Sequence, residues 1–212
     1  MEKQQIIMEL EFSEYEALRQ EIIANAGIIA DVFTISITAA VVILGYGVQR
    51  EQETEGDTGS WLLFLCPLAI LAPSLWFISS QLESTVRIAT YIQTFIETGQ
   101  DVLNWETRLS LLRQAGTSSG TLYTFSISTV YMGLGLVSLV LSICYVFKNK
   151  RETRARIVRI AFCLALFVPM VIACHQFNMR LTPKFTQEYK EKWEAVGRLE
   201  KENNAHSQPT LK

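Results

Sequence analysis

The sequence has few of the residue types, and few of the motifs, on which most enzyme centres are built. Histidine occurs only as His175 and His206, and the four cysteines show no CxxC spacing. The patterns of zinc proteases (HExxH), P-loops and dinucleotide-binding folds (GxGxxG) are absent. The serine-hydrolase pattern GxSxG occurs once, at residues 116–120, but it follows a stretch with helical periodicity and not a strand, so it lacks the strand-to-helix turn that places a nucleophilic serine. We therefore expect a protein that is not an enzyme, with no catalytic residue, no metal site and no cofactor. The net charge of −2 also argues against a nucleic-acid partner.

Charged side chains are missing from four long stretches, at residues 32–49, 58–82, 114–147 and 160–179. About 20 helical residues cross a hydrocarbon core of about 30 Å, so each stretch is able to span a bilayer. Core helices of a soluble bundle are the alternative, but those are amphipathic, and these stretches are apolar almost all round. With 49% hydrophobic residues and a mean hydropathy of +0.20, the sequence predicts an all-α fold. We expect a four-helix transmembrane bundle with amphipathic cytoplasmic helices.

The pattern of polar and apolar residues divides the chain into five parts. Residues 27–80 and 121–177 are the two predicted transmembrane hairpins. Residues 1–26 read as an amphipathic helix, and 81–120 as an extramembrane helical connection. Residues 178–212 are expected to form an amphipathic helix followed by a disordered tail.

Local signals predict where some of these helices begin and bend. A capping box that begins at Ser13 predicts a helix start there, with the helix running on into the first span. Thr182 followed by Pro183 predicts the start of the C-terminal helix, because proline suits the first helical position. In the second span Pro67 and Pro73 should each kink the helix, since each removes a backbone hydrogen bond.

Four spans place both termini and the 81–120 connection on one side of the membrane. The distribution of basic residues does not clearly indicate whether that side is cytoplasmic. The basic turn at 148–159 favours one orientation, and eight residues on the other side oppose it: Arg19, Arg87, Arg108, Arg113, Arg180, Lys184, Lys190 and Lys192. We predict cytoplasmic termini, because only two short links then cross the bilayer. The expected location is the bacterial cytoplasmic (inner) membrane, as a multi-pass protein. If the C-terminal tail lay outside the cell, the basic turn at 148–159 would be the segment that determines the orientation.

Asp31 is the one acidic residue in a predicted span, and it lies about one turn inside the first. An intramembrane carboxylate is costly and often marks a functional site. At headgroup depth, the alternative, it costs little. One face of this helix carries Asp31, Thr34, Thr38 and Gly45. A polar pathway across the membrane along this face is therefore a hypothesis.

The third predicted span carries a seam of small and hydroxyl-bearing residues at spacings of three and four: Ser128, Tyr131, Gly135, Ser138, Ser142 and Tyr145. Helices in lipid associate through close approach and interhelical hydrogen bonds, which such a seam provides. Two interpretations stay open: an oligomer or pore seam, and packing within one four-helix bundle. In both, this face should not meet lipid.

Aromatic residues mark the extramembrane helices. Trp105 lies on the apolar face of a short helix in the connection, and Phe185, Tyr189 and Trp193 share one face of the C-terminal helix. We expect these four side chains to be a docking face for a soluble cytoplasmic protein. The alternative is that amphipathic helices so close to a bilayer lie on its surface.

Three stretches carry a resemblance to known proteins: YEALRQEI at 15–22, YIQTFIE at 91–97 and NWE at 104–106. They cover about the first half of the chain, and in them the chain resembles a loose group of uncharacterised bacterial four-span membrane proteins. By architecture alone it is also similar to membrane components of bacterial antiphage defence systems. The group implies a four-span fold and no activity that transfers to particular residues.

Three functions follow from these observations. The leading hypothesis is a non-enzymatic membrane protein that forms homo-oligomers and acts as a sensor or membrane-perturbing effector, in bacterial antiphage defence. The second is a small ion or solute channel or transporter that uses Asp31 and the polar face of the first span. The third is a structural scaffold for another membrane complex.

Overall fold

The structure, a computed structural model, confirms the all-α fold. It describes residues 2–53, 60–97, 106–109, 119–148, 153–180 and 182–207. Four helical segments are long and apolar enough to cross a membrane: Phe12–Glu51, Trp61–Ile96, Ser126–Lys148 and Thr153–Arg180. The chain is therefore a multi-pass membrane protein embedded in a lipid bilayer, as the four uncharged stretches predict.

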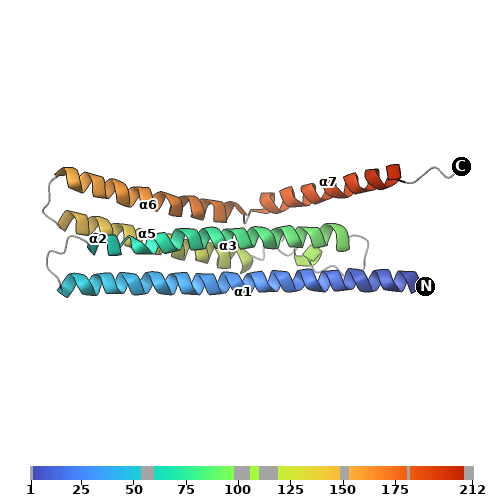
Figure 1. Cartoon of the computed structure of the whole chain (residues 1–212), viewed down its shortest axis with the longest axis horizontal. Helices are drawn as coiled ribbons and strands as arrows, with labels where there is room; N and C mark the ends of the chain where they lie inside the picture. The colour runs from blue at the N-terminus through green and yellow to red at the C-terminus, as the bar shows by residue number, and fades with distance from the viewer. Residues whose placement is uncertain are drawn as a thin grey trace. The chain divides into compact units, whose positions relative to one another are not determined.

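The chain divides into two compact units (Figure 1). Unit 1 comprises Met1–Gly27, Gln81–Gly120 and Arg180–Lys212. Unit 2 comprises Ile28–Ser80 and Thr121–Met179, and so contains the central part of every span.

Helix α1 (Glu2–Glu53) runs without a break from unit 1 into unit 2. The helix start predicted at Ser13 is wrong, because Ser13 lies inside this helix. The residues before it, EKQQIIMELEF, are mostly strong helix formers, and a serine or glutamate is tolerated in a helix interior at small cost. A capping box marks a start only where the preceding residues do not continue the helix.

The second span is interrupted just before Pro67, one of the two prolines at which the sequence predicts a kink; Pro73, the other, lies inside α3 (Cys66–Tyr91). Phe64 and Leu65 form a turn between α2 (Ser60–Leu63) and α3. The Leu68 N–H donates to Leu65 O at 3.0 Å, three residues back, and leaves Phe64 O without its helical donor. The Ser138 hydroxyl donates to that oxygen from α5 (Ser119–Lys148). A hydroxyl from a neighbouring helix thus satisfies a carbonyl for which lipid offers no donor.

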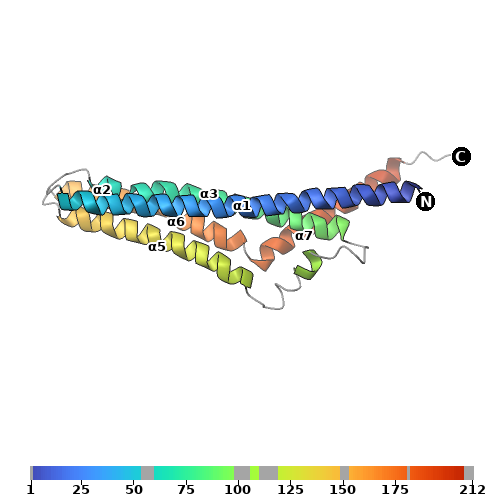
Figure 2. The ribbon, with the colours of Figure 1, turned by 90° about the horizontal axis from the view of Figure 1, so that it is seen from below.

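In unit 2, α3 and α5 lie between α1 and α6 (Thr153–Arg180), as Figures 1 and 2 show. Two apolar clusters among the described residues belong to the core of this unit. In one, Leu44 of α1 meets Phe64 and Tyr145; in the other, Cys163 of α6 meets apolar residues of the second and third spans. The outer helices are the least covered: 22% of the most apolar stretch is buried in each, against 50% in the second span and 39% in the third.

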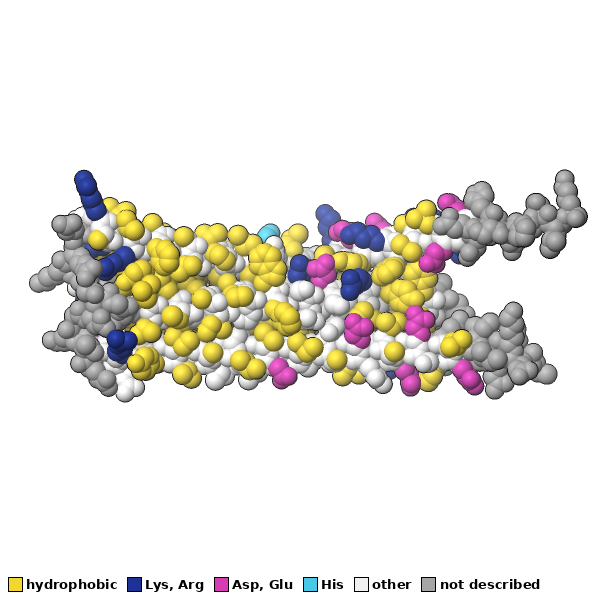
Figure 3. All heavy atoms as spheres, in the orientation of Figure 1, with side chains coloured by type: hydrophobic (Ala, Val, Ile, Leu, Met, Phe, Trp, Pro, Cys, Tyr) yellow, Lys and Arg dark blue, Asp and Glu magenta, His cyan; other side chains and the backbone are white. Residues whose placement is uncertain are grey.

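The outside of unit 2 is apolar. On the face seen in Figure 3, hydrophobic side chains cover the middle of unit 2, acidic side chains gather over unit 1, and basic side chains lie over unit 1 and at the far end of unit 2. Exposed members of this surface lie on every span and include Val41, Phe77, Val140, Phe162 and Val168. Such a surface suits acyl chains and not water.

Unit 1 is built from the N-terminal part of α1, the end of α3, the π-helical turn η1 (Ile92–Ile96) and α7 (Pro183–Ser207). Its core joins α1 to α3 and η1 through Tyr15, Ile88, Ile92 and Ile96. Helix α7 begins at Pro183, as predicted, and the Thr182 hydroxyl accepts the Phe185 N–H at 3.4 Å. The predicted disordered tail falls partly on residues 208–212, which lie outside the described part of the chain.

Candidate functional site

The seam predicted on the third span is buried inside unit 2. All six of its residues are buried: Ser128, Tyr131, Gly135, Ser138, Ser142 and Tyr145. They lie on one face of α5 because they recur at the three- and four-residue spacing of a helix. That face is turned toward the other spans and away from the apolar outside.

Tyr131 is the centre of a hydroxyl cluster that joins three spans. Its hydroxyl is hydrogen-bonded to Ser36 of α1 and to Ser74 of α3. The Phe33 ring lies 5.9 Å from the Tyr131 ring, centroid to centroid. Ser36 and Ser74 also donate within their own helices, to Phe33 O at 3.0 Å and to Ile70 O.

The rest of the seam fixes α5 against its neighbours. Ser142 donates to Ser138 O at 2.9 Å, and the Tyr145 ring lies 6.1 Å from the Phe64 ring. A Cβ added at Gly135 would lie 3.4 Å from Met170 and from Phe167, so α6 approaches α5 closely there. The described contacts of the seam join the spans of this chain, as packing within one four-helix bundle requires; a role as an oligomer or pore seam stays a prediction.

The polar face of the first span lies on the outside of unit 2. Asp31, Thr34 and Thr38 are all exposed, and a Cβ added at Gly45 would meet nothing within 4 Å. Thr34 donates to Ala30 O at 2.9 Å, within its own helix. Among the residues that the structure describes, none forms a hydrogen bond or ion pair with the Asp31 carboxylate. The spans of one chain therefore leave this face uncovered.

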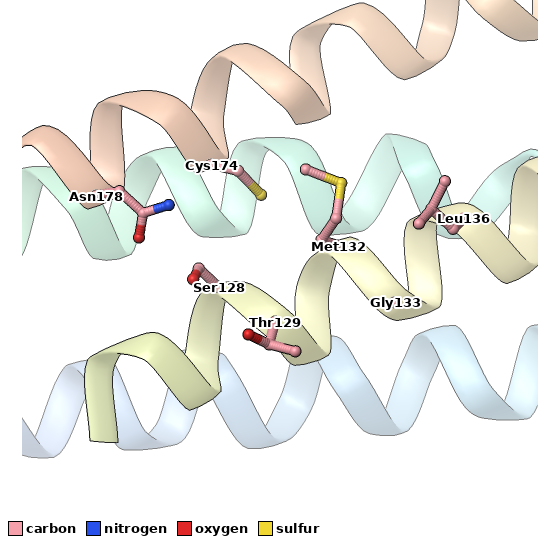
Figure 4. A pocket seen from close by; sticks show the side chains of 7 residues that line it. All are labelled: Ser128, Thr129, Met132, Gly133, Leu136, Cys174 and Asn178. Carbon is pink, nitrogen blue, oxygen red and sulfur yellow. The ribbon is translucent and has the colours of Figure 1, made fainter. Parts of the chain in front are cut away.

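A groove of about 360 Å³ lies between α5 and α6 (Figure 4). Ser128 and Thr129 of α5 lie with Asn178 of α6 at one end, and Met132 and Leu136 extend toward the other. Such a volume is at the small end of ligand pockets, which are roughly 300–1,000 Å³. No lining side chain is charged, so the groove suits an apolar guest and not a charged substrate.

A buried carboxylate organises unit 1. Glu97 follows η1, and its N–H donates to Ile92 O at 2.9 Å. Its carboxylate accepts the N–H groups of Glu106 and Thr107, both at 2.7 Å, and the Thr107 hydroxyl at 2.6 Å. These donors are at the start of the short helical turn at 106–109, so the Glu97 side chain caps the N-terminus of that turn, although Glu97 is not adjacent to it in the sequence. Gln93 adds a bond to Glu106 O at 2.8 Å.

Two aromatic residues of α7 contact α3 of the same chain. The Tyr189 hydroxyl donates to the Glu83 carboxylate at 2.7 Å, and the Trp193 indole N–H donates to Arg87 O at 3.2 Å. The hydrogen bond to Glu83 raises the pKa of Tyr189 above its ordinary value, and partial burial raises that pKa further. Arg180 forms an ion pair with the same carboxylate at 2.9 Å.

Three of the four predicted docking residues, all on α7, are described and have partners within unit 1. The Trp193 ring packs on Tyr91 and Phe95 at centroid distances of 5.2 and 6.0 Å, so it serves the internal packing of unit 1. Phe185 stacks on Tyr189 at 5.2 Å. Trp105 lies outside the described residues. Docking of a soluble partner by these residues stays a prediction.

Sequence reasoning missed Glu83 and Glu97. Glu83 carries the regular four-residue spacing of an exposed helical face, and Glu97 stands beside a glycine in a polar stretch. Both read as solvated charges, because their partners are distant in sequence or are backbone groups. Neither partner leaves a pattern in the sequence.

The described residues include no group of three or more histidine, cysteine or acidic side chains placed to hold a metal ion. Cys174 is buried while its neighbour His175 is exposed, so the two side chains point apart on α6. No protein-family model, curated protein or solved structure matches the chain. Of the resemblance to bacterial four-span membrane proteins, the structure therefore supports the four apolar helices and no family.

Proposed function

We propose that this chain is a non-enzymatic membrane protein that self-associates in the bilayer and acts as a sensor or membrane-perturbing effector. The observation that carries the proposal is the uncovered polar face of α1, with Asp31, Thr34 and Thr38 outside the chain's own bundle. Polar groups in lipid pair with one another or with protein, so a further copy is the natural cover. The seam on α5 no longer serves this argument, because its described contacts are internal.

The purified chain in mild detergent or in nanodiscs tests self-association. We expect mass photometry or light scattering to give particles of more than one copy. A particle with the mass of one chain, at protein concentrations up to those in a membrane, would contradict the proposal.

For orientation we propose cytoplasmic termini in a bacterial inner membrane. Unit 1 then presents a charged helical surface to the cytoplasm, where a soluble protein would reach the exposed Val196 and Leu199 of α7. Single cysteines introduced near the two termini should react with a membrane-impermeant maleimide only after the cells are broken. Labelling in intact spheroplasts would reverse the orientation.

The role in antiphage defence rests on similarity of architecture. Expression in a bacterial host, with its genomic neighbours, should lower the plating efficiency of some phages and depolarise the membrane during infection. Unchanged plating and potential across a diverse phage panel would remove this part of the proposal.

The second candidate function is a small channel or transporter. The exposed carboxylate of Asp31 favours it, because oligomerisation around α1 would bring several copies of that carboxylate together. Within one bundle the buried polar side chains described in unit 2 are serine and tyrosine hydroxyls, which carry no charge. In proteoliposomes, Asp31→Asn should change ion flux or selectivity if this function holds; equal flux in wild type and variant would reject it.

A further inference from the structure

Helix α6 carries an exposed stripe that matches the polar face of α1. On α1 the exposed stripe recurs at spacings of three and four: Asp31, Thr34, Thr38, Val41 and Gly45. On α6 an equally exposed stripe has the same spacings: Ala161, Ala165, Val168, Ile172 and His175. Repeats of this kind form the seams by which membrane helices pack.

Each stripe ends in an ionisable side chain at about the same depth. Asp31 is the fourth residue of unit 2 on α1, and His175 is the fifth from the end of unit 2 on α6. At 1.5 Å per residue both lie roughly 6 Å inside the unit, on the side where the termini emerge. In the described part of the chain, neither side chain has a hydrogen-bond or ion-pair partner. An imidazole and a carboxylate are complementary groups that gain most by pairing where water is scarce.

We propose that α1 of one copy packs antiparallel against α6 of a second copy, with Asp31 against His175 of that copy. The proposal rests on the proposed self-association and names its interface. Successive spans of one chain cross the bilayer in opposite directions, so α1 and α6 of two equally oriented copies are antiparallel.

The register that joins Asp31 to His175 also aligns the rest of both stripes. It places Thr34 opposite Ile172, Thr38 opposite Val168, Val41 opposite Ala165, and Gly45 opposite Ala161. A small residue stands in each of the last two pairs, which permits close approach of the backbones. A Cβ at Gly45 would meet nothing of its own chain within 4 Å, so the space there is open to a neighbour.

The contact is head to tail. Because α3 and α5 lie between α1 and α6 in unit 2, the two stripes are on opposite flanks (Figures 1 and 2). Two copies joined by one such contact each keep one free stripe. Further copies add until a ring closes, or a filament grows if the rotation does not close.

A mixing experiment with the full chain in nanodiscs or mild detergent tests the contact. Thr38→Trp blocks the α1 stripe, Ala165→Trp blocks the α6 stripe, and Ile35→Trp is the control on an exposed position outside the stripes. We expect each stripe variant alone to associate at least about tenfold more weakly than wild type, while the control associates normally. An equal mixture of the two stripe variants should form a particle of two copies, because one intact contact remains.

The other outcomes separate the two proposals. If Ala165→Trp alone still associates like wild type, or if the mixture stays monomeric, the α1–α6 contact is overturned while self-association stands. If wild type itself is monomeric, both proposals fail. Unchanged thermal unfolding of each variant will show that the bundle remains folded.

The polar pair has its own test. Asp31→His or His175→Asp places like groups opposite each other, and each should weaken association by about tenfold. The double variant exchanges the two groups and should return association to within about threefold of wild type. A double variant no better than the single ones would overturn the pairing of Asp31 with His175.

Discussion

Unit 1 and unit 2 expose opposite kinds of side chain, although each buries an apolar core. Unit 2 buries serine and tyrosine hydroxyls along α5 and exposes valine, leucine and phenylalanine. Unit 1 buries the isoleucines of α3 and η1, and its exposed positions on α7 are largely lysine, glutamate and arginine. One chain thus packs its helices in two ways.

The difference follows from the solvent that each unit meets. In water, burial of apolar surface is the main force that brings helices together. In lipid that force vanishes between helices, so close packing and interhelical hydrogen bonds hold the spans. The hydroxyl cluster of Tyr131, Ser36 and Ser74 in unit 2 is an example of the second kind of packing, and the buried Ile88, Ile92 and Ile96 of unit 1 are an example of the first. The predictions below test this comparison.

A new charge on the outside separates the units most strongly. Val140 of α5 is 53% exposed and Leu199 of α7 is 58% exposed, so a substitution at either position removes no core contact. Val140→Lys should cost about 2.5–3.5 kcal/mol, because its ammonium would face acyl chains near the middle of a span. Leu199→Lys should change stability by less than about 0.5 kcal/mol. Yield of membrane-inserted protein and thermal unfolding in detergent measure both, and equal effects would contradict the comparison.

Loss of the buried carboxylate should be the largest effect within unit 1. Glu97→Ala leaves the N–H groups of Glu106 and Thr107 without their acceptor, at a cost of about 3 kcal/mol. Hydrogen exchange at those two amides should accelerate, while amides of unit 2 keep their protection. Glu194→Ala, at an exposed position of α7, is the matched control and should leave exchange unchanged. Slow exchange in Glu97→Ala would show that the carboxylate does not cap the turn.

Removal of one hydroxyl measures the hydrogen bonds of unit 2. Tyr131→Phe deletes the bonds to Ser36 and Ser74 and should cost about 1 kcal/mol, the scale of interhelical hydrogen bonds in membranes. Tyr46→Phe is the control, because Tyr46 is 56% exposed on α1. Unfolding in mixed micelles with increasing denaturing detergent compares the two variants. Equal stability would mean that the cluster contributes packing and no net hydrogen-bond energy.

The smallest effect concerns the attachment of α7 to α3. The raised pKa of Tyr189 means that folding favours its protonated form, whose hydroxyl donates to Glu83. That stabilisation is complete below the unfolded pKa of about 10 and is lost as pH rises through the folded value. Fluorescence in a background that keeps Trp193 as its single tryptophan should therefore change above about pH 10. In Tyr189→Phe the titration should shrink, and an identical titration would assign it to another group.

The sequence predicted the four spans because the absence of charge over about 20 residues is a local property that one stretch carries alone. It also predicted a disturbance of the helix at Pro67, since a missing N–H acts within one turn, although it expected a kink and not an interruption. It predicted an amphipathic helix over residues 1–26 but placed a helix start at Ser13, where the capping signal was outweighed by the good helix formers before it. Nor did it predict the bonds of Glu97 and Glu83, whose donors are backbone groups or lie far away in the sequence. The Asp31 face was visible as a pattern, but its exposure depends on which helices flank it.

The central claim is that residues exposed on unit 2 meet lipid and those exposed on unit 1 meet water. Spin labels at single cysteines in a cysteine-free background test it, at Val140 and Val168 in unit 2 and at Glu194 and Leu199 in unit 1. In liposomes the account predicts high accessibility to oxygen and low accessibility to a water-soluble nickel chelate at the first pair, and the reverse at the second. Comparable nickel accessibility at all four positions would contradict it.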